Sequence, residues 1–201
     1  PLPSWGILRP EEAENYMSML FKAHPDCNFI HYNHSYLARI RMYADNYERL
    51  CKKHKNFVAV KNACCEHLDI RLMAERDLPL LEYYLEFFYT LAHMRYNPSF
   101  LPSILCINRT LALEYYDAGQ RKDFQTLLKI DAQSQRVREI MAETLPGNMN
   151  DGAYDKLFAR INDPTFPIRM YPPYFGADEQ QYESFYAQLK ARVPEWLATT
   201  P

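Results

Sequence analysis

The chain has 201 residues, of which 48% are hydrophobic and 24% are charged, and its formal net charge is -2. This is enough apolar sequence for one substantial core, and no division into two domains is forced. Acidic and basic residues are mixed throughout, and no basic block is present that would track a phosphate backbone, so the pattern argues against nucleic-acid binding. The five glycines are too dispersed for a G-x-G-x-x-G or phosphate-cradling loop, which argues against Rossmann dinucleotide binding and P-loop chemistry.

The cysteine pattern predicts a reducing environment. The five cysteines are odd in number and show no framework spacing, which favours reduced thiols in a cytoplasmic protein over a disulfide scaffold. The longest apolar runs are far shorter than the ~18 residues that span a bilayer, and no charged-then-apolar signal segment opens the sequence, so we expect no membrane association. The first residue is Pro1 rather than Met, so we expect the sequence to be processed or to be a piece of a longer one.

Strand and helix patterns alternate through the first half of the chain. A helix is predicted over 9–24, where a proline and two glutamates suit a helix N-terminus, and further helices are predicted over 44–54 and 65–75. Short β-prone runs lie between them, in the order "CNFIHYN" (27–33), "NFVAVK" (56–61), "PLLEYYLEF" (79–87) and the weaker "SFLPSIL" (99–105). We expect these four strands to end near Tyr32, Lys61, Phe87 and Ser103.

The alternation predicts a parallel sheet with right-handed crossovers, since strands separated by helices pair in this way. The run "FVAV" (57–60) is apolar throughout, as expected for a parallel strand covered on both faces. From about Asn108 the pattern becomes helical. Four α/β units with a helical tail fit half of a doubly wound sheet or half of a (β/α)8 barrel, whose full form takes ~250 residues.

Lys61 ends an apolar strand, and Tyr32 ends the strand before it. At the carboxyl ends of parallel barrel strands, where active sites lie, neighbouring strands are ~4.8 Å apart, so the amine and the phenol can approach each other. Desolvation would lower the pKa of a lysine there and make it a nucleophile towards a carbonyl, with the tyrosine passing protons. The spacing alone also fits two unrelated strand ends.

The segment "FIHYN" (29–33), followed by "FVAVKNA" (57–63), resembles the dihydrodipicolinate synthase and N-acetylneuraminate lyase family of class I aldolases. The segments "GQRKDFQTLL" (119–128) and "YDKLFARINDPTFPIRMYPPYFGADEQQYESF" (154–185) are similar to the family's helical tail. The resemblance implies that the chain is α/β and forms strands five to eight of a TIM barrel (1–107), then the last barrel helix and a helical extension (108–201). It also implies that Lys61 forms a Schiff base with a 2-keto acid and that Tyr32 is the proton relay.

The same resemblance implies a small-molecule partner, a pyruvate-type 2-keto acid or a sugar acid, and a homo-oligomer, with no cofactor. We expect Asn33, Glu86 and Ser103 to contact the substrate. The family's Thr-Thr-Gly-Glu-type loop and its first three strands have no counterpart in this sequence. Within the matched region, Ala63 stands where Thr or Ser is frequent, and "HSYLAR" follows Tyr-Asn where Val-Pro and an arginine are common, with Arg39 or Arg41 as a substitute. These departures leave the particular substrate open.

Other interpretations of the sequence are a metal site, a thiol nucleophile, a polyproline ligand and a protein without activity. His31, His34, Cys64, Cys65 and His67 could suggest a metal site or a thiol nucleophile, but they lack zinc-ligand spacing and an evident activating base. The segment "YPPYFG" (171–176) fits a rigid connector better than a polyproline ligand. The alternative to a Schiff-base lyase is a truncated or degenerate relative without activity, which retains a fold remnant or an interaction surface.

Overall fold

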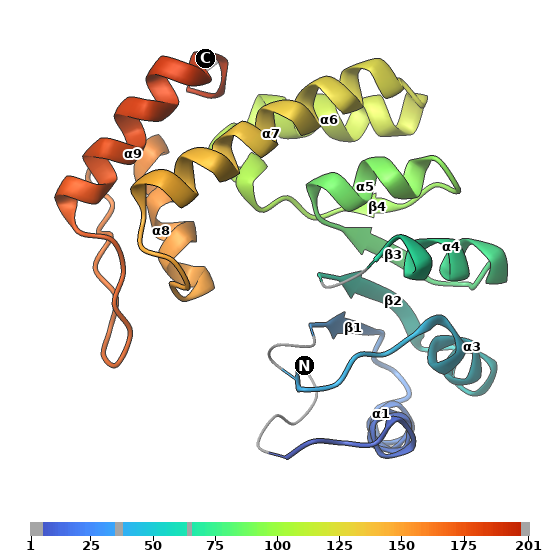
Figure 1. The fold of residues 1–201 in the computed structure, drawn as a ribbon. Coiled ribbons are helices and arrows are strands. Elements are labelled where there is room, and N and C mark those ends of the chain that lie inside the picture. The colour runs from blue at the N-terminus through green and yellow to red at the C-terminus, as the bar shows by residue number, and fades with distance from the viewer. Residues whose placement is uncertain (1–5, 35–37, 64–65, 198–201) are drawn as a thin grey trace. The chain divides into compact units, whose positions relative to one another are not determined.

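The computed structural model describes residues 6–34, 38–63 and 66–197, and the chain forms two compact units, Pro1–Leu101 and Pro102–Pro201. The boundary lies six residues before the change predicted at 107/108. The first unit alternates strands and helices (Figure 1). Its elements are α1 (Pro10–Ala23), β1 (Phe29–Asn33), α3 (Ala44–Lys53), β2 (Phe57–Asn62), α4 (His67–Arg76), β3 (Leu81–Tyr84), α5 (Glu86–His93) and β4 (Ser99–Phe100).

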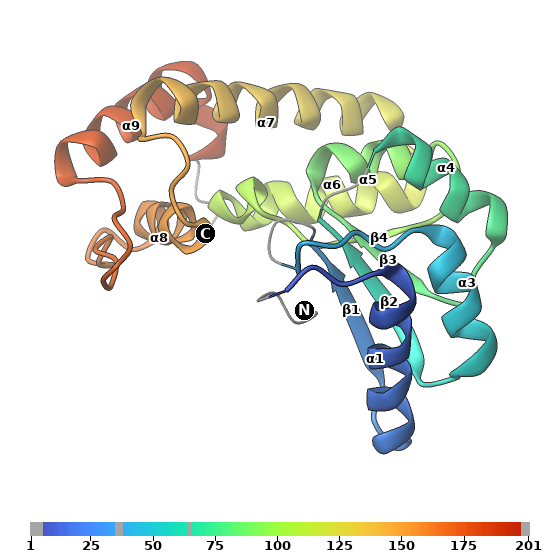
Figure 2. The same ribbon diagram turned by 60° about the horizontal axis from the view of Figure 1, so that its bottom comes forward.

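The four strands form one parallel sheet in the order β1-β2-β3-β4. The chain connects neighbouring strands through helices, as parallel pairing requires. The helices α1, α3, α4 and α5 lie along one face of the sheet, and none of the helices described in this unit lies on the other face (Figures 1 and 2). We call the helix-covered side the covered face and the opposite side the open face. This parallel α/β arrangement is the one that the sequence predicts.

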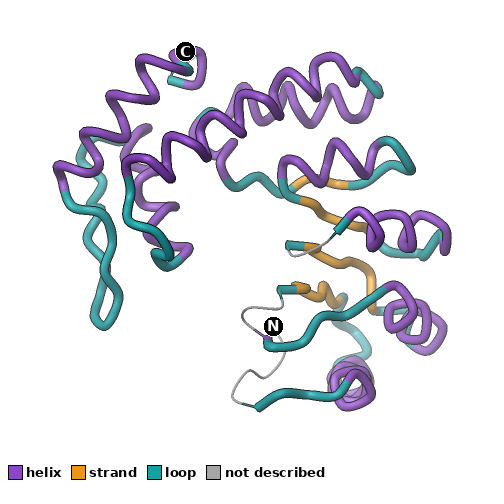
Figure 3. The backbone as a smooth tube through the Cα atoms, in the orientation of Figure 1, coloured by secondary structure: helices purple, strands orange, loops and turns teal. Residues whose placement is uncertain are grey.

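Two strands are shorter than the sequence suggests. β3 ends at Tyr84 rather than near Phe87, because Glu86 already begins α5. β4 contains only Ser99 and Phe100 and does not reach Ser103, because Pro102 has no backbone N–H to continue the ladder. Figure 3 shows how short this strand is beside β1 and β2. The apolar run that follows Phe100 forms a 3-10 helix, η1, instead of strand.

Helix α1 and the sheet share an aromatic core. Pro10 occupies the first turn of α1, where a missing N–H costs nothing, and the Glu12 carboxylate accepts a hydrogen bond from the Arg9 backbone N–H at 2.8 Å. On the buried side of the helix, the Phe21 ring stacks on Phe57 of β2 at 5.3 Å and contacts Phe29 of β1 at 4.8 Å between ring centroids. These contacts attach the first helix to the beginnings of both strands.

The second unit is helical. It consists of η1 (Ile104–Ile107), α6 (Arg109–Arg121), α7 (Phe124–Thr144), α8 (Asp151–Asn162), α9 (Glu179–Arg192) and η2 (Pro194–Trp196). Asn108 caps α6 by accepting from the Leu111 N–H at 2.9 Å, and Asp178 with Gln181 forms a capping box at α9. Its core is made of Tyr115, Leu127, Ile130, Val137, Leu157, Phe185, Leu189 and Trp196, each at most 2% exposed.

Candidate active site

A row of four half-buried side chains crosses the open face near the ends of the strands. Tyr32 of β1 is paired in register with Lys61 of β2, Lys61 with Tyr83 of β3, and Tyr83 with Ser99 of β4. Residues in register on parallel strands point to the same side of the sheet. The strands therefore present a phenol, an amine, a second phenol and a hydroxyl side by side.

Lys61 and Tyr32 are in contact within this row. The Lys61 Nζ lies 4.2 Å from the centroid of the Tyr32 ring, a cation–π distance. Within the described residues, no carboxylate lies close enough to Nζ to form an ion pair. The aromatic ring is thus the group that holds the amine on the open face, and the structure brings together the two residues that the sequence singles out.

The next residue of each strand points to the covered face, where the polar side chains are bonded to one another. The Asn33 Nδ2 donates to the Met42 carbonyl at 2.9 Å and to the Asn62 Oδ1 at 3.2 Å. The Asn62 Nδ2 in turn donates to the Tyr84 hydroxyl at 3.4 Å. These hydrogen bonds between Asn33, Asn62 and Tyr84 link β1, β2 and β3. They fix the register that aligns the row on the opposite face.

Asn33 is therefore not part of the row on the open face. Its side chain is 4% exposed, and its Oδ1 also accepts from the Met42 N–H at 3.2 Å. The backbone of the segment before α3 is held to β1 by this pair of bonds. We assign Asn33 to the support of the sheet and leave it out of the candidate site.

A buried carboxyl ends the polar chain. Glu82 is 5% exposed, and its Oε2 accepts hydrogen bonds from the hydroxyls of Tyr84, at 2.8 Å, and of Tyr96. Burial raises the pKa of Glu82 above its ordinary value of 4.5, while the two hydroxyl donors act in the opposite direction. Burial likewise raises the pKa of Tyr96 well above its ordinary value, so the Tyr96 hydroxyl stays a protonated donor.

His31 is the second buried titratable group of the covered face. Its Nδ1 lies 3.0 Å from the Tyr47 hydroxyl, while its Nε2 has no hydrogen-bond partner among the described residues. The ring is 7% exposed, and burial lowers its pKa from 6.5 to about 4. His31 is therefore neutral in the folded protein near neutral pH.

Two further expected substrate contacts lie outside the row. Glu86 is the first residue of α5 and is 2% exposed, so it is not among the half-buried side chains of the open face. Ser103 belongs to the second unit, where it precedes η1. Ser99, which the sequence does not single out, occupies the register position beside Tyr83.

No metal site is found in the part of the chain that the structure describes, since no three His, Cys, Asp or Glu side chains there are placed to hold an ion. Cys64 and Cys65 lie outside the described residues, as does the side chain of His67. Burial raises the pKa of the Cys51 thiol to about 11, which disfavours its thiolate. Of the helices described, none is long and apolar enough to cross a membrane.

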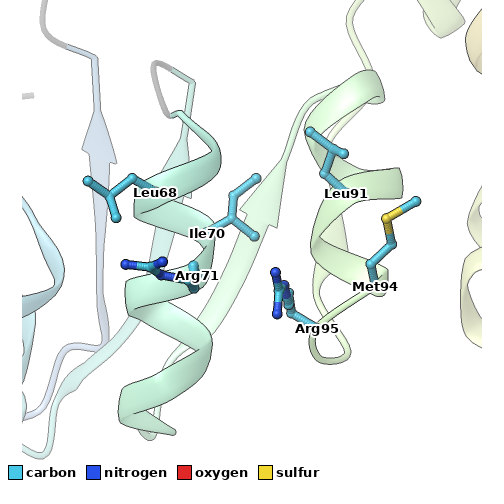
Figure 4. A pocket seen from close by; sticks show the side chains of 6 residues that line it. All are labelled: Leu68, Ile70, Arg71, Leu91, Met94 and Arg95. Carbon is cyan, nitrogen blue, oxygen red and sulfur yellow. The ribbon is translucent and has the colours of Figure 1, made fainter.

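Cavities are found among the described residues of both units. One, of about 410 Å³, lies between α4 and α5 and is lined by Leu68, Ile70, Arg71, Leu91, Met94 and Arg95 (Figure 4). Another, of about 450 Å³, is formed within the second unit by residues of the 168–179 segment, which connects α8 to α9 and includes "YPPYFG".

The fold matches many solved structures. CdNal from Clostridium difficile, in complex with mannosamine, matches with a TM-score of 0.76 and 13% identity, over 94% of this chain and 63% of that one. The Ruminococcus gnavus sialic acid aldolase matches with a TM-score of 0.76 and 15% identity, over 94% and 62% of the two chains. A 2-keto-3-deoxygluconate aldolase variant from Sulfolobus solfataricus matches with a TM-score of 0.77 and 10% identity, over 96% and 64%.

No family model matches the sequence, and no curated protein matches it significantly. Structures described as belonging to the dihydrodipicolinate synthase family, from Coccidioides immitis and Escherichia coli, match over 97% and 94% of the chain. The chain spans a little over three fifths of the length of the solved structures that it matches. It therefore has the fold of part of a TIM barrel with a helical C-terminal extension, as found in structures of N-acetylneuraminate lyases and the dihydrodipicolinate synthase family.

Proposed function

We propose that the protein is a Schiff-base-forming lyase or aldolase that acts on a 2-keto acid, with Lys61 as the nucleophile and Tyr32 as the proton relay. The observation that carries the proposal is the pairing of Lys61 with Tyr32 on the open face, in register and with Nζ 4.2 Å from the ring centroid. The fold supports it, since solved structures with this fold include sialic acid and 2-keto-3-deoxygluconate aldolases, one a catalytic lysine mutant and one a family member in complex with pyruvate.

The proposed reaction begins when the unprotonated Lys61 amine attacks the ketone carbon of the substrate. The resulting carbinolamine loses its hydroxyl as water, with the proton supplied through the Tyr32 hydroxyl, and an iminium forms. The electron pair of the carbon–carbon or carbon–hydrogen bond next to that carbon then moves toward the iminium nitrogen as the bond breaks. Because the iminium accepts these electrons, the reaction calls for no metal, nucleotide or flavin.

Reductive trapping tests the proposal. Borohydride added in the presence of pyruvate should fix one reduced pyruvyl group on the protein, detected as a mass increase and located by peptide mapping on Lys61. The Lys61→Arg variant should gain no adduct. Lys55→Arg changes an exposed lysine in the turn before β2 and should be labelled like the unmodified protein. Labelling spread over exposed lysines, or equal labelling of the Lys61→Arg variant, would refute the proposal.

The alternative is a protein without catalytic activity that uses the open face as an interaction surface. One observation favours it: Ile30 and Leu81 are 55% and 47% exposed on that face. A contiguous apolar patch on an exposed sheet face is a surface that a partner can cover. The trapping experiment separates the two, because an interaction surface gains no pyruvate-dependent adduct on Lys61.

A further inference from the structure

The Tyr32 ring is contacted by a second side chain besides Lys61. His34 follows the end of β1, and its ring lies 5.3 Å from the Tyr32 ring between centroids, at an interplanar angle of 89°. This is the perpendicular arrangement that two aromatic rings in contact favour. The Lys61 Nζ lies over the face of the same tyrosine ring, 4.2 Å from its centroid. Tyr32 is thus contacted by the proposed nucleophile and by an imidazole.

The backbone on both sides of this imidazole is fixed by hydrogen bonds. The Asn33 carbonyl accepts from the Ala63 N–H at 3.2 Å, which extends the pairing of β1 with β2. The His34 carbonyl accepts from the Ala38 N–H at 3.0 Å. His34 itself is half-buried. Because its backbone is held in place, its ring can act as a fixed support for the ring of Tyr32.

The contact with the amine alone does not fix the direction of the Tyr32 hydroxyl. A cation is attracted to the face of a ring by the ring quadrupole, and this attraction persists while the ring swings about its side-chain torsions. A second ring that meets the first at a right angle limits that swing. Proton transfer requires such a limit, because the donor has to lie within hydrogen-bond reach of the atom that takes the proton.

We infer that His34 is a positioning residue, whose ring holds Tyr32 so that its hydroxyl stays beside the atoms bonded to Lys61. The inference rests on the proposed function and deepens it, since Tyr32 is the proton relay there. In the loss of water, the Tyr32 hydroxyl gives its proton to the departing hydroxyl of the carbinolamine. His34 forms and breaks no bond in this step, so another planar ring can take its place.

The rate of imine formation tests this role. Labelling of Lys61 by pyruvate is followed over a range of pyruvate concentrations, with cyanoborohydride in such excess that imine formation limits the rate. In His34→Ala the maximal labelling rate should fall by about 10- to 100-fold, since a small displacement of a catalytic group can cost a factor of this order. The pyruvate concentration that gives half of the maximal rate should stay the same, because His34 does not hold the substrate.

Two further variants at the same position separate the ring from its bulk. His34→Phe keeps a planar ring and should restore most of the labelling rate, whereas His34→Leu fills similar space without a ring and should remain slow. If His34→Phe were as slow as His34→Leu, positioning by the ring would be overturned. If His34→Ala does not fold by circular dichroism, the comparison of these two variants decides alone.

A double-mutant cycle shows whether the effect passes through the Tyr32 hydroxyl. In Tyr32→Phe that hydroxyl is absent, so adding His34→Ala should slow labelling no further. A general loss of structure would slow labelling by the same factor with and without the hydroxyl, and that result would overturn the inference.

His54 supplies the matched control, because its ring meets the Phe21 ring in a similar way, at 5.4 Å and 73°, in the turn before β2. His54→Ala should leave the labelling rate unchanged at temperatures where it is folded, and a slowing equal to that of His34→Ala would overturn a specific role. If the unmodified protein gains no adduct on Lys61, the proposed function is wrong and the inference falls with it. If it is labelled and both His34→Ala and His34→Leu keep the rate, only the role of His34 is overturned.

Discussion

The two faces of the sheet use the same strands in opposite ways. On the covered face, Asn33, Asn62 and Tyr84 are bonded to one another and are at most 4% exposed. On the open face, their immediate chain neighbours Tyr32, Lys61 and Tyr83 are half-buried, and the Lys61 amine contacts the Tyr32 ring. Polar bonds on one side hold the strands in register, and on the other side the amine and the ring of the proposed site meet.

This comparison predicts that substitutions on the open face change chemistry without changing stability, whereas substitutions on the covered face change stability. The largest expected effect is that of Tyr32→Phe. Removing the proposed proton relay should slow carbon–carbon cleavage or formation by about 10²- to 10⁴-fold. The free energy of unfolding should change by no more than about 0.5 kcal/mol. Turnover with a 2-keto acid and chemical denaturation measure the two effects.

Tyr84→Phe is the matched control variant on the covered face for Tyr32→Phe. That variant removes a hydroxyl from the covered face, which donates to Glu82 and contacts Tyr96. We expect it to lower the free energy of unfolding by about 1–3 kcal/mol, because a buried acceptor loses its donor. If Tyr32→Phe were the more destabilising of the two, the division of roles between the faces would be wrong.

The next largest effect is the loss of folding stability at low pH that results from the lowered pKa of His31. Its pKa is about 4 in the folded protein and 6.5 ordinarily, so its stabilising contribution is fully present above about pH 6.5 and is lost as the pH falls through 4. The shift corresponds to about 3 kcal/mol. His31→Leu should flatten the decline in the free energy of unfolding between about pH 6.5 and 4, measured by denaturation at several pH values. If the free energy of unfolding of His31→Leu declined as steeply as that of the unmodified protein, His31 would not be the group responsible.

Glu82 should change the pH dependence of the free energy of unfolding in the opposite direction to His31, and by a smaller amount. Its folded pKa is raised above 4.5, so its contribution is present below about pH 4.5 and is lost as the pH rises through the raised value. The increase in the pKa of Glu82 that burial causes is partly offset by the hydrogen-bond donors Tyr84 and Tyr96, so the effect on stability is limited. In Glu82→Gln, which stays neutral, the free energy of unfolding should fall less between about pH 4.5 and 7.5 than in the unmodified protein. If the free energy of unfolding of Glu82→Gln fell more steeply than that of the unmodified protein, the pKa of Glu82 would not be raised in the folded state.

The smallest effect is expected at Ile30, on the open face of β1 and 55% exposed. Ile30→Thr keeps the β-branched shape that suits a strand and should change the free energy of unfolding by less than about 0.5 kcal/mol. A loss of more than about 1 kcal/mol in thermal or chemical denaturation would indicate that another part of the protein or a second copy covers this face.

The sequence predicts the parallel alternation and the neighbourhood of Tyr32 and Lys61, because both follow from strand period and from strand ends that meet at one edge. It does not predict where β3 ends, since the three apolar residues of "LEFF" (85–88) suit a strand or a helix. The alternation of side chains could have assigned Asn33 to the face opposite Tyr32. Only the register shows that Tyr83 rather than Tyr84 is the neighbour of Lys61 on β3, and that Ser99 is the neighbour of Tyr83 on β4.

The contact of Lys61 with the Tyr32 ring has a consequence for where positive charge is stabilised along the proposed reaction. The face of an aromatic ring attracts a cation by about 0.5–2 kcal/mol, whether the cation is an ammonium or an iminium. The iminium carries that charge at the nitrogen, which in the free amine lies 4.2 Å from the ring centroid. The neutral carbinolamine carries no such charge, so the ring favours the iminium over the carbinolamine and draws the loss of water forward.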